Sequence, residues 1–305
     1  QIRLNQMTLR RPRQWGGCWL AMELWNQLGL DSFWASLLPA SRKGTEWLHV
    51  LKTLVCYRLL DPGSEWRLHC DWFKTSAMSD LLGEDDSVVA KDTLYRCLDK
   101  VCEHKTDLFS FLQKQWSLLF HASYDVLLYD LTSTYFECDP PAEEGLRRFG
   151  YSRDKRSDCV QVVIALIVTP EGFPVAYEVM PGNTSDRTTL PDFLRKVEKQ
   201  HGKINRLWIM DRGIPTEEAL GQMRAEGANY LVGTPRGRLS KLEDQLFALP
   251  WKQVQDQIEV KLARDDEDLY VLTRSGGRRD KEQSMRRRRL KKLWKRLHQI
   301  RGMKQ

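Results

Sequence analysis

The stretch VLLYDLTSTYF, residues 126–136, carries one acidic side chain, Asp130, inside a run that is otherwise mostly apolar, aromatic or β-branched. A run of this length and composition predicts a β-strand. A lone carboxylate in such a strand is costly to bury unless it is paired or bound to a metal ion. Asp130 is therefore a candidate functional residue as well as a marker of the first strand.

Further elements are expected on the C-terminal side of this strand. Residues 160–169 and 173–180 form two more strand-like runs, and the turn Pro170-Glu171-Gly172 between them predicts a hairpin. A helix, a strand, a helix and a strand are then expected at residues 188–200, 206–210, 216–226 and 229–233. The order β-β-β-α-β-α-β predicts the α/β class, with an RNase H-like mixed sheet flanked by helices.

The segments around this expected core differ from it in character. Residues 1–122 show apolar side chains at spacings of three and four, which predicts an N-terminal helical domain. Residues 236–277 contain weak strands and are interpreted as a partial β-rich insertion, and residues 278–305 as a basic amphipathic helix. The core itself is assigned to residues 123–235.

The composition excludes several classes of protein. With 305 residues, 41% of them hydrophobic, the chain has enough apolar material for a real core, so global disorder is not expected. The sequence contains no apolar run of about 18 residues and no readable signal peptide, so we expect a soluble, cytoplasmic protein without a membrane partner. Seven scattered cysteines without a C-x-x-C pair argue against a disulfide framework.

The net charge of +7 is distributed unevenly. Residues 278–305 carry 13 Lys or Arg against 2 Asp or Glu, a net charge of +11, whereas residues 1–277 carry 35 against 39, a net charge of −4. A basic segment of this kind suits a polyanion such as DNA, and a solvated helix face is the alternative. The candidate DNA-binding residues in this segment are Arg286, Arg287, Arg288, Arg289, Lys291 and Lys292.

A second acidic residue repeats the setting of Asp130. Asp211 directly follows the apolar run Leu-Trp-Ile-Met at residues 207–210. Either aspartate alone would be interpreted as a loop or helix-cap residue. At the ends of adjacent strands, however, the two carboxylates would share hard cations. Two Mg²⁺ ions about 3.5–4 Å apart activate an oxygen nucleophile and stabilise a leaving oxygen at a phosphodiester, and a third acid usually completes such a site.

Four motifs carry a resemblance to a known family. They read YDLTSTYFE at residues 129–137, GYSRDKR at 150–156, YEVMPGNTSD at 177–186 and DRG at 211–213. In this order and spacing they resemble the DDE transposases of bacterial insertion sequences, in the group whose RNase H-like core is interrupted by a β-rich insertion. The resemblance spans at least residues 45–300.

The resemblance implies that Asp130 and Asp211 are the first and second catalytic acids and metal ligands, with Mg²⁺ or Mn²⁺ as the cofactor. It also implies a last acid, a Glu in a Tyr-Arg-Glu-Lys helix after the insertion, which the sequence does not show. Glu282 is the nearest candidate, in a segment that the resemblance places before that helix. We therefore expect a C-terminally truncated, incomplete transposase.

The activity implied by the resemblance is metal-dependent cleavage and strand transfer of DNA during transposition. The expected partners are double-stranded DNA, as element ends and as target, and a second copy of the chain in a homodimer when complete. The expected location is a bacterial cytoplasm, in association with the nucleoid. The helical domain would bind the DNA end or mediate dimerisation.

Three basic residues lie in the segment between the first two expected strands. Arg153, Lys155 and Arg156 are candidate contacts for the substrate backbone, with a solvated loop as the alternative. Two other functions also stay open. One is an RNase H-type nuclease without strand transfer, and the other is a non-catalytic DNA-binding remnant.

Overall fold

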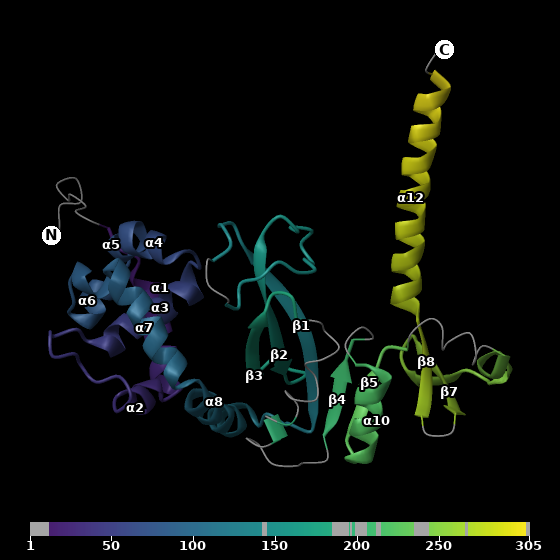
Figure 1. Cartoon of the computed structure of the whole chain (residues 1–305), viewed down its shortest axis with the longest axis horizontal. Coiled ribbons are helices and arrows are strands. Elements are labelled where there is room, and N and C mark those ends of the chain that lie inside the picture. Colours follow the sequence, from purple (N-terminus) through teal and green to yellow (C-terminus); the bar gives the residue numbers. More distant parts are fainter. Residues whose placement is uncertain are drawn as a thin grey trace, which may run out of the picture. The chain divides into compact units, whose positions relative to one another are not determined.

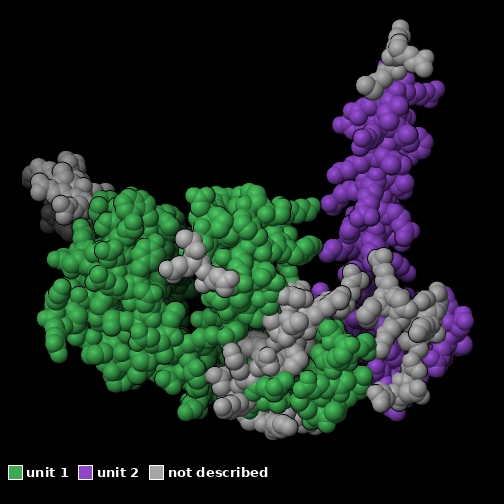
Figure 2. Space-filling model, viewed as in Figure 1, with its two compact units in different colours: residues 1–210, 214–231 green, residues 211–213, 232–305 purple. Residues whose placement is uncertain are grey.

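The computed structural model describes residues 12–141, 145–184, 195, 197–198, 206–211, 215–234, 244–265 and 268–302. The helix expected at residues 188–200 lies for the most part outside the described residues. The chain forms two compact units, residues 1–210 with 214–231 and residues 211–213 with 232–305, which Figure 2 shows in green and purple. Among the described residues, no helix is long and apolar enough to cross a membrane.

The N-terminal part of the first unit is helical, as the spacing of its apolar residues predicts. Its elements are α1 (Trp15–Gln27), α2 (Leu30–Trp34), α3 (Trp47–Leu60), α4 (Glu65–Arg67), the π-helix η2 (Leu68–Trp72), α5 (Phe73–Thr75), α6 (Met78–Leu82), the 3-10 helix η3 (Asp86–Val89), α7 (Lys91–Glu103) and α8 (Lys105–Phe120). Helix α3 has eight buried residues, more than α1, α7 or α8, and Val50 and Tyr57 among them are fully buried. Its buried Lys52 keeps a counterion, because Nζ lies 2.6 Å from Oδ1 of Asp31.

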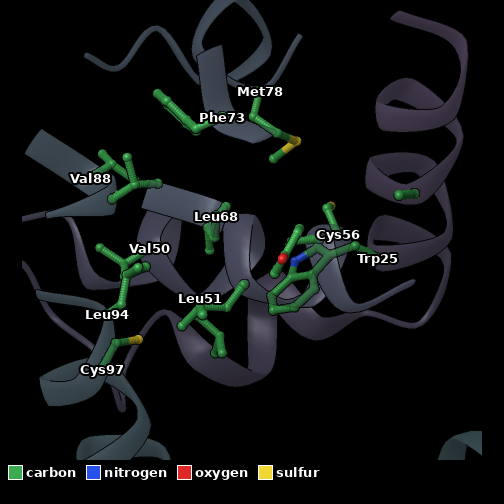
Figure 3. Packing of buried hydrophobic residues seen from close by; sticks show 14 of the residues in the cluster. Trp25, Val50, Leu51, Cys56, Leu68, Phe73, Met78, Val88, Leu94 and Cys97 are labelled. Atoms are coloured by element: carbon green, nitrogen blue, oxygen red, sulfur yellow. The ribbon is translucent and has the colours of Figure 1, made fainter. Parts of the chain in front are cut away.

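The helices enclose one apolar core, part of which Figure 3 shows. Trp25 of α1 and Leu51 of α3 face the same interior as Leu68 of η2 and Leu94 of α7. Each of these side chains contributes about 1.5–3 kcal/mol when it is fully removed from water. The helical region therefore has its own hydrophobic core.

The remainder of the first unit is built around a five-stranded mixed sheet in the order β3-β2-β1-β4-β5 (Figure 1). The strands are β1 (Val126–Phe136), β2 (Val160–Val168), β3 (Pro174–Pro181), β4 (Leu207–Met210) and β5 (Asn229–Val232), and helix α10 (Glu217–Ala225) connects the last two. Strands β1, β2 and β3 form an antiparallel meander, and β4 pairs with β1 in parallel. The predicted RNase H-like sheet, flanked by helices, is confirmed.

Helix α8 joins the helical region to the sheet. Gln113 on α8 donates from Nε2 to the carbonyl oxygen of Val175 on β3, at 3.0 Å. Trp116 and Phe120 stack on Phe173, each with ring centroids 5.3 Å apart. The helical region and the sheet therefore share one compact unit, and the predicted boundary between residues 122 and 123 stays a prediction.

The second unit contains a three-stranded antiparallel sheet and one long helix. Its elements are β6 (Lys252–Gln255), β7 (Ile258–Asp265), β8 (Asp268–Ser275) and α12 (Gly276–Gly302). Strands at the places of β7 and β8 were expected, but β6 was not, because all four of its residues are exposed and show no apolar alternation. No side chain of α12 is buried in the described part of the chain, so the predicted apolar stripe has no partner there.

Candidate active site

Asp130 and Asp211 come directly after two residues that pair with each other across neighbouring strands. Strands β1 and β4 run parallel, and their register pairs Leu128 with Ile209 and then Tyr129 with Met210. Asp130 and Asp211 are the residues that come directly after that last pair. The pairing therefore ends one residue before each aspartate, at the C-terminal end of β4, where open α/β sheets bind ligands.

Both carboxylates are exposed, whereas the residues before them are buried. Tyr129 and Met210 belong to the core. Because side chains alternate along a strand, Asp130 points to the face opposite to Tyr129 and Leu131. Its side chain is 74% exposed, and Oδ1 accepts a hydrogen bond from the Leu131 N–H at 2.7 Å. The burial cost that singled out Asp130 in the sequence does not arise, because the strand delivers this carboxylate to solvent.

The segment between β1 and β2, residues 145–159, brings a basic side chain to Asp130. Nη1 of Arg153 lies 3.9 Å from Oδ1 of Asp130. Lys155 follows in a turn, where its N–H donates to the Ser152 carbonyl at 3.2 Å and its φ is +61°. Positive charge therefore lies beside the first acid, and the predicted phosphate contacts of Arg153 and Lys155 stay predictions.

Arg156 is held differently. Its guanidinium lies 2.6 Å from Oε1 of Glu137, at the end of β1, and 3.0 Å from Oδ1 of Asp158. Hydrogen bonds to Asp158 and then to Glu137 raise the pKa of Arg156, and the hydrogen bond from Arg156 lowers the pKa of Asp158 to about 2. Two carboxylates already balance this cation, so Arg156 ties the segment to β1. The DNA contact predicted for it stays a prediction.

We name residues 145–159 the anchored loop, because a buried glutamine holds its backbone. Gln161 is 1% exposed, and its Nε2 donates to the carbonyl oxygens of Tyr151, at 3.0 Å, and Gly182, at 2.9 Å. A Cβ added to Gly150 would lie 1.9 Å from the carbonyl oxygen of Gly182, so only glycine fits there. The sequence analysis missed this anchor. Its signal was a polar side chain inside the apolar run of β2.

The two aspartates offer hard oxygen ligands, which Mg²⁺ and Mn²⁺ prefer. Among the described residues, however, no group of three or more His, Cys, Asp or Glu is placed to hold a metal ion. Glu282, the nearest candidate for a last acid, lies on α12 and accepts a hydrogen bond from Nε of Arg278 at 2.9 Å. The donor chemistry of Asp130 and Asp211 fits part of a metal site, and the described residues show no third ligand.

The other predicted DNA contacts lie on α12. The six residues are exposed along this helix: Arg286, Arg287, Arg288, Arg289, Lys291 and Lys292. Their exposure leaves them accessible to a polyanion, as electrostatic contact with DNA requires. The structure does not relate them to Asp130, because α12 belongs to the second unit and Asp130 to the first.

The chain was compared with solved structures, curated proteins and models of protein families. Among solved structures, a piggyBac transposase synaptic complex with hairpin DNA is 14% identical, with a TM-score of 0.36, over 75% of this chain and 50% of that chain. A Mos1 transposase paired-end complex with the left transposon end is 10% identical, with a TM-score of 0.26, over 65% of this chain and 70% of the other. The chain thus spans half the length of the piggyBac transposase chain.

No curated protein matches the chain. The sequence model of the family described as "Transposase DDE domain" matches residues 122–303, which is more than half of the chain and includes both aspartates. The chain therefore belongs to the transposase DDE domain family.

Proposed function

We propose that this chain cleaves DNA phosphodiester bonds and transfers the cut strand during transposition, with Asp130 and Asp211 as its first two catalytic acids. One observation carries the proposal. The parallel pairing of β1 and β4 ends at Tyr129 and Met210, the residues directly before the two aspartates, and both aspartates are exposed. Membership of the family supports the reaction class, and the register supports the choice of residues.

Asp130 and Asp211 would hold Mg²⁺ or Mn²⁺, which supplies an activated oxygen nucleophile and stabilises a leaving oxygen at a phosphodiester. The hydrogen bond from the Leu131 N–H fixes one carboxylate oxygen of Asp130 and leaves the other available as a ligand. Arg153, 3.9 Å from the same carboxylate, would neutralise charge on the phosphate of a bound strand. Lys155 would add a second positive charge on the same loop.

The proposed substrate is double-stranded DNA, both as the element ends and as the target. The basic face of α12 would supply affinity that does not depend on sequence, through release of counterions from the phosphate backbone. The homodimer and the location at a bacterial nucleoid, both implied by the resemblance, stay predictions.

The catalytic proposal is tested with Asp130→Ala and Asp211→Ala. Nicking of a supercoiled plasmid in Mg²⁺ or Mn²⁺ is measured together with Mn²⁺ affinity by calorimetry. Each variant should lose about 100-fold or more in cleavage rate, by analogy with removal of one group that stabilises a transition state, and should bind Mn²⁺ more weakly. Asp139→Ala is the matched control, because Asp139 is another exposed aspartate on the unit that contains Asp130. Unchanged Mn²⁺ affinity in both site variants would falsify the assignment.

One alternative function is favoured by a specific observation. The described residues show no third acid beside Asp130 and Asp211, as expected for a DNA-binding remnant that does not cut. Such a remnant would bind the plasmid in a salt-dependent way and leave it intact at every Mg²⁺ concentration. If cleavage is seen but no joined products form, the chain is a nuclease of the RNase H type instead.

A further inference from the structure

The anchored loop, which also carries Arg153, exposes two aromatic side chains. Tyr151 is 88% exposed and Phe149 is 51% exposed. They lie two residues apart and precede Arg153, whose guanidinium reaches Asp130. Single exposed apolar residues are common on protein surfaces and need no explanation. Two aromatic residues on one firmly held loop, which also brings Arg153 to a proposed catalytic acid, call for a partner.

The backbone on both sides of these aromatic residues is fixed. The N–H of Arg148 donates to the carbonyl oxygen of Gln161 at 3.0 Å, and the N–H of Gln161 returns a bond to the Arg148 carbonyl at 2.9 Å. On the other side, the Gln161 side chain donates to the carbonyl oxygen of Tyr151. Because the backbone is already ordered, a ligand that contacts Tyr151 does not have to order it, and such preorganisation raises affinity.

The charge of the loop selects a polyanion. Its charged residues are five Arg or Lys against two Asp, and the ion pair of Arg156 with Asp158 leaves four cations against one acid: Arg147, Arg148, Arg153 and Lys155 against Asp154. Aromatic rings among cationic side chains form the usual surface for unpaired nucleic acid, where bases stack on the rings and phosphates contact the cations. The bases of an intact duplex are stacked on one another, so an exposed ring of this kind favours an unpaired base.

We propose that Tyr151 stacks on an unpaired nucleobase of the DNA strand that lies at Asp130, with Phe149 as a lesser contact. The choice of DNA rests on the proposed function. Tyr151 thereby becomes a positioning residue that favours single-stranded or frayed DNA ends over closed duplex. Arg153, two residues after Tyr151 and with its guanidinium 3.9 Å from Asp130, would contact the adjoining phosphate.

The proposal is tested by binding without metal, so that cleavage plays no part. Fluorescence anisotropy in EDTA compares a short blunt duplex with the same duplex carrying a single-stranded overhang. The wild-type chain should favour the overhang, and Tyr151→Ala should lose about 5- to 150-fold of its affinity for that probe, since stacking contributes about 1–3 kcal/mol per base. Tyr151→Phe should keep most of the preference for the overhang, because it keeps the aromatic ring. This variant also shows whether a substitution at this position leaves the loop folded.

Phe247→Ala serves as the control, because Phe247 is also an exposed ring, at 74%, but lies in the second unit. It should bind both probes like the wild-type chain. The proposal is overturned if Tyr151→Ala keeps the wild-type ratio of the two affinities, or if it weakens both probes equally. Failure of the stacking proposal would leave the assignment of Asp130 and Asp211 intact. Asp130→Ala and Asp211→Ala proteins that lose cleavage but keep the preference for the overhang would separate the two proposals.

Discussion

Substitution of Gly182 by alanine should detach the anchored loop. The added Cβ would lie 2.0 Å from the carbonyl oxygen of Gln161 and 2.4 Å from that of Arg148, and both are backbone atoms that a side-chain rotation cannot move. The bonds at risk are Gly182 N–H to Leu146 O, the reciprocal pair between Arg148 and Gln161, and Gln161 Nε2 to Gly182 O. At about 0.5–1.5 kcal/mol each, these four bonds amount to about 2–6 kcal/mol. The loop can separate without unfolding the sheet, so a loss near the lower end, about 2–3 kcal/mol, is expected.

Equilibrium unfolding in urea measures this loss, and limited tryptic cleavage after Arg153 reports the release of the loop. Gly16→Ala is the control, because no atom lies within 4 Å of its added Cβ and the residue is in helix α1. It should leave stability unchanged or raise it by up to about 1 kcal/mol. A Gly182→Ala protein with the wild-type urea midpoint and wild-type resistance to trypsin would refute the reasoning.

Three further predictions concern the core, a thiol and a charge pair. Trp34→Ala should reduce the free energy of unfolding by about 3–5 kcal/mol, measured in urea, because this large side chain is 2% exposed. Burial raises the pKa of the Cys97 thiol to about 12, so at pH 8 iodoacetamide should modify exposed Cys138 and leave Cys97 intact until urea is added, as mass spectrometry can show. The pKa of Asp158 is lowered from 3.8 to about 2, so the ion pair with Arg156 stabilises the fold above pH 4 and this stabilisation is lost as the pH falls toward 2. The wild-type chain should therefore melt at a slightly higher temperature than Asp158→Asn above pH 4. This difference in melting temperature should vanish as the pH is lowered to 2.

Much of the sheet was predictable because β2 buries a nearly continuous apolar run and β1 alternates more buried with less buried residues. The predicted and observed bounds of β1 coincide at Val126–Phe136, and those of β2 differ only at its last residue. Strand β6 was missed, since its four exposed residues, Lys252–Gln255, carry no apolar alternation and depend on pairing with β7. Hydrophobic periodicity reports burial, and a strand without burial gives no such signal.

The candidate site was predictable only in part. Asp130 and Asp211 were chosen because each follows a run of apolar strand residues, but the pairing of the residues before them, Tyr129 with Met210, depends on the register between β1 and β4, which the sequence does not contain. The role of Gln161 was hidden for a related reason. Its polar side chain stood out inside the apolar run of β2, but its partners are carbonyl oxygens of Tyr151 and Gly182, and residue types do not reveal a main-chain partner.

Helix α12 has a physical consequence that its sequence alone does not reveal. Its 27 residues, at a rise of about 1.5 Å each, make a rod of about 40 Å. With no side chain buried in the described part of the chain, the rod gains no packing free energy there, while four successive arginines, Arg286–Arg289, repel one another within a single turn. A polyanion laid along it would screen that repulsion. Backbone order in this segment and occupancy of its basic surface are therefore thermodynamically linked, so that each promotes the other.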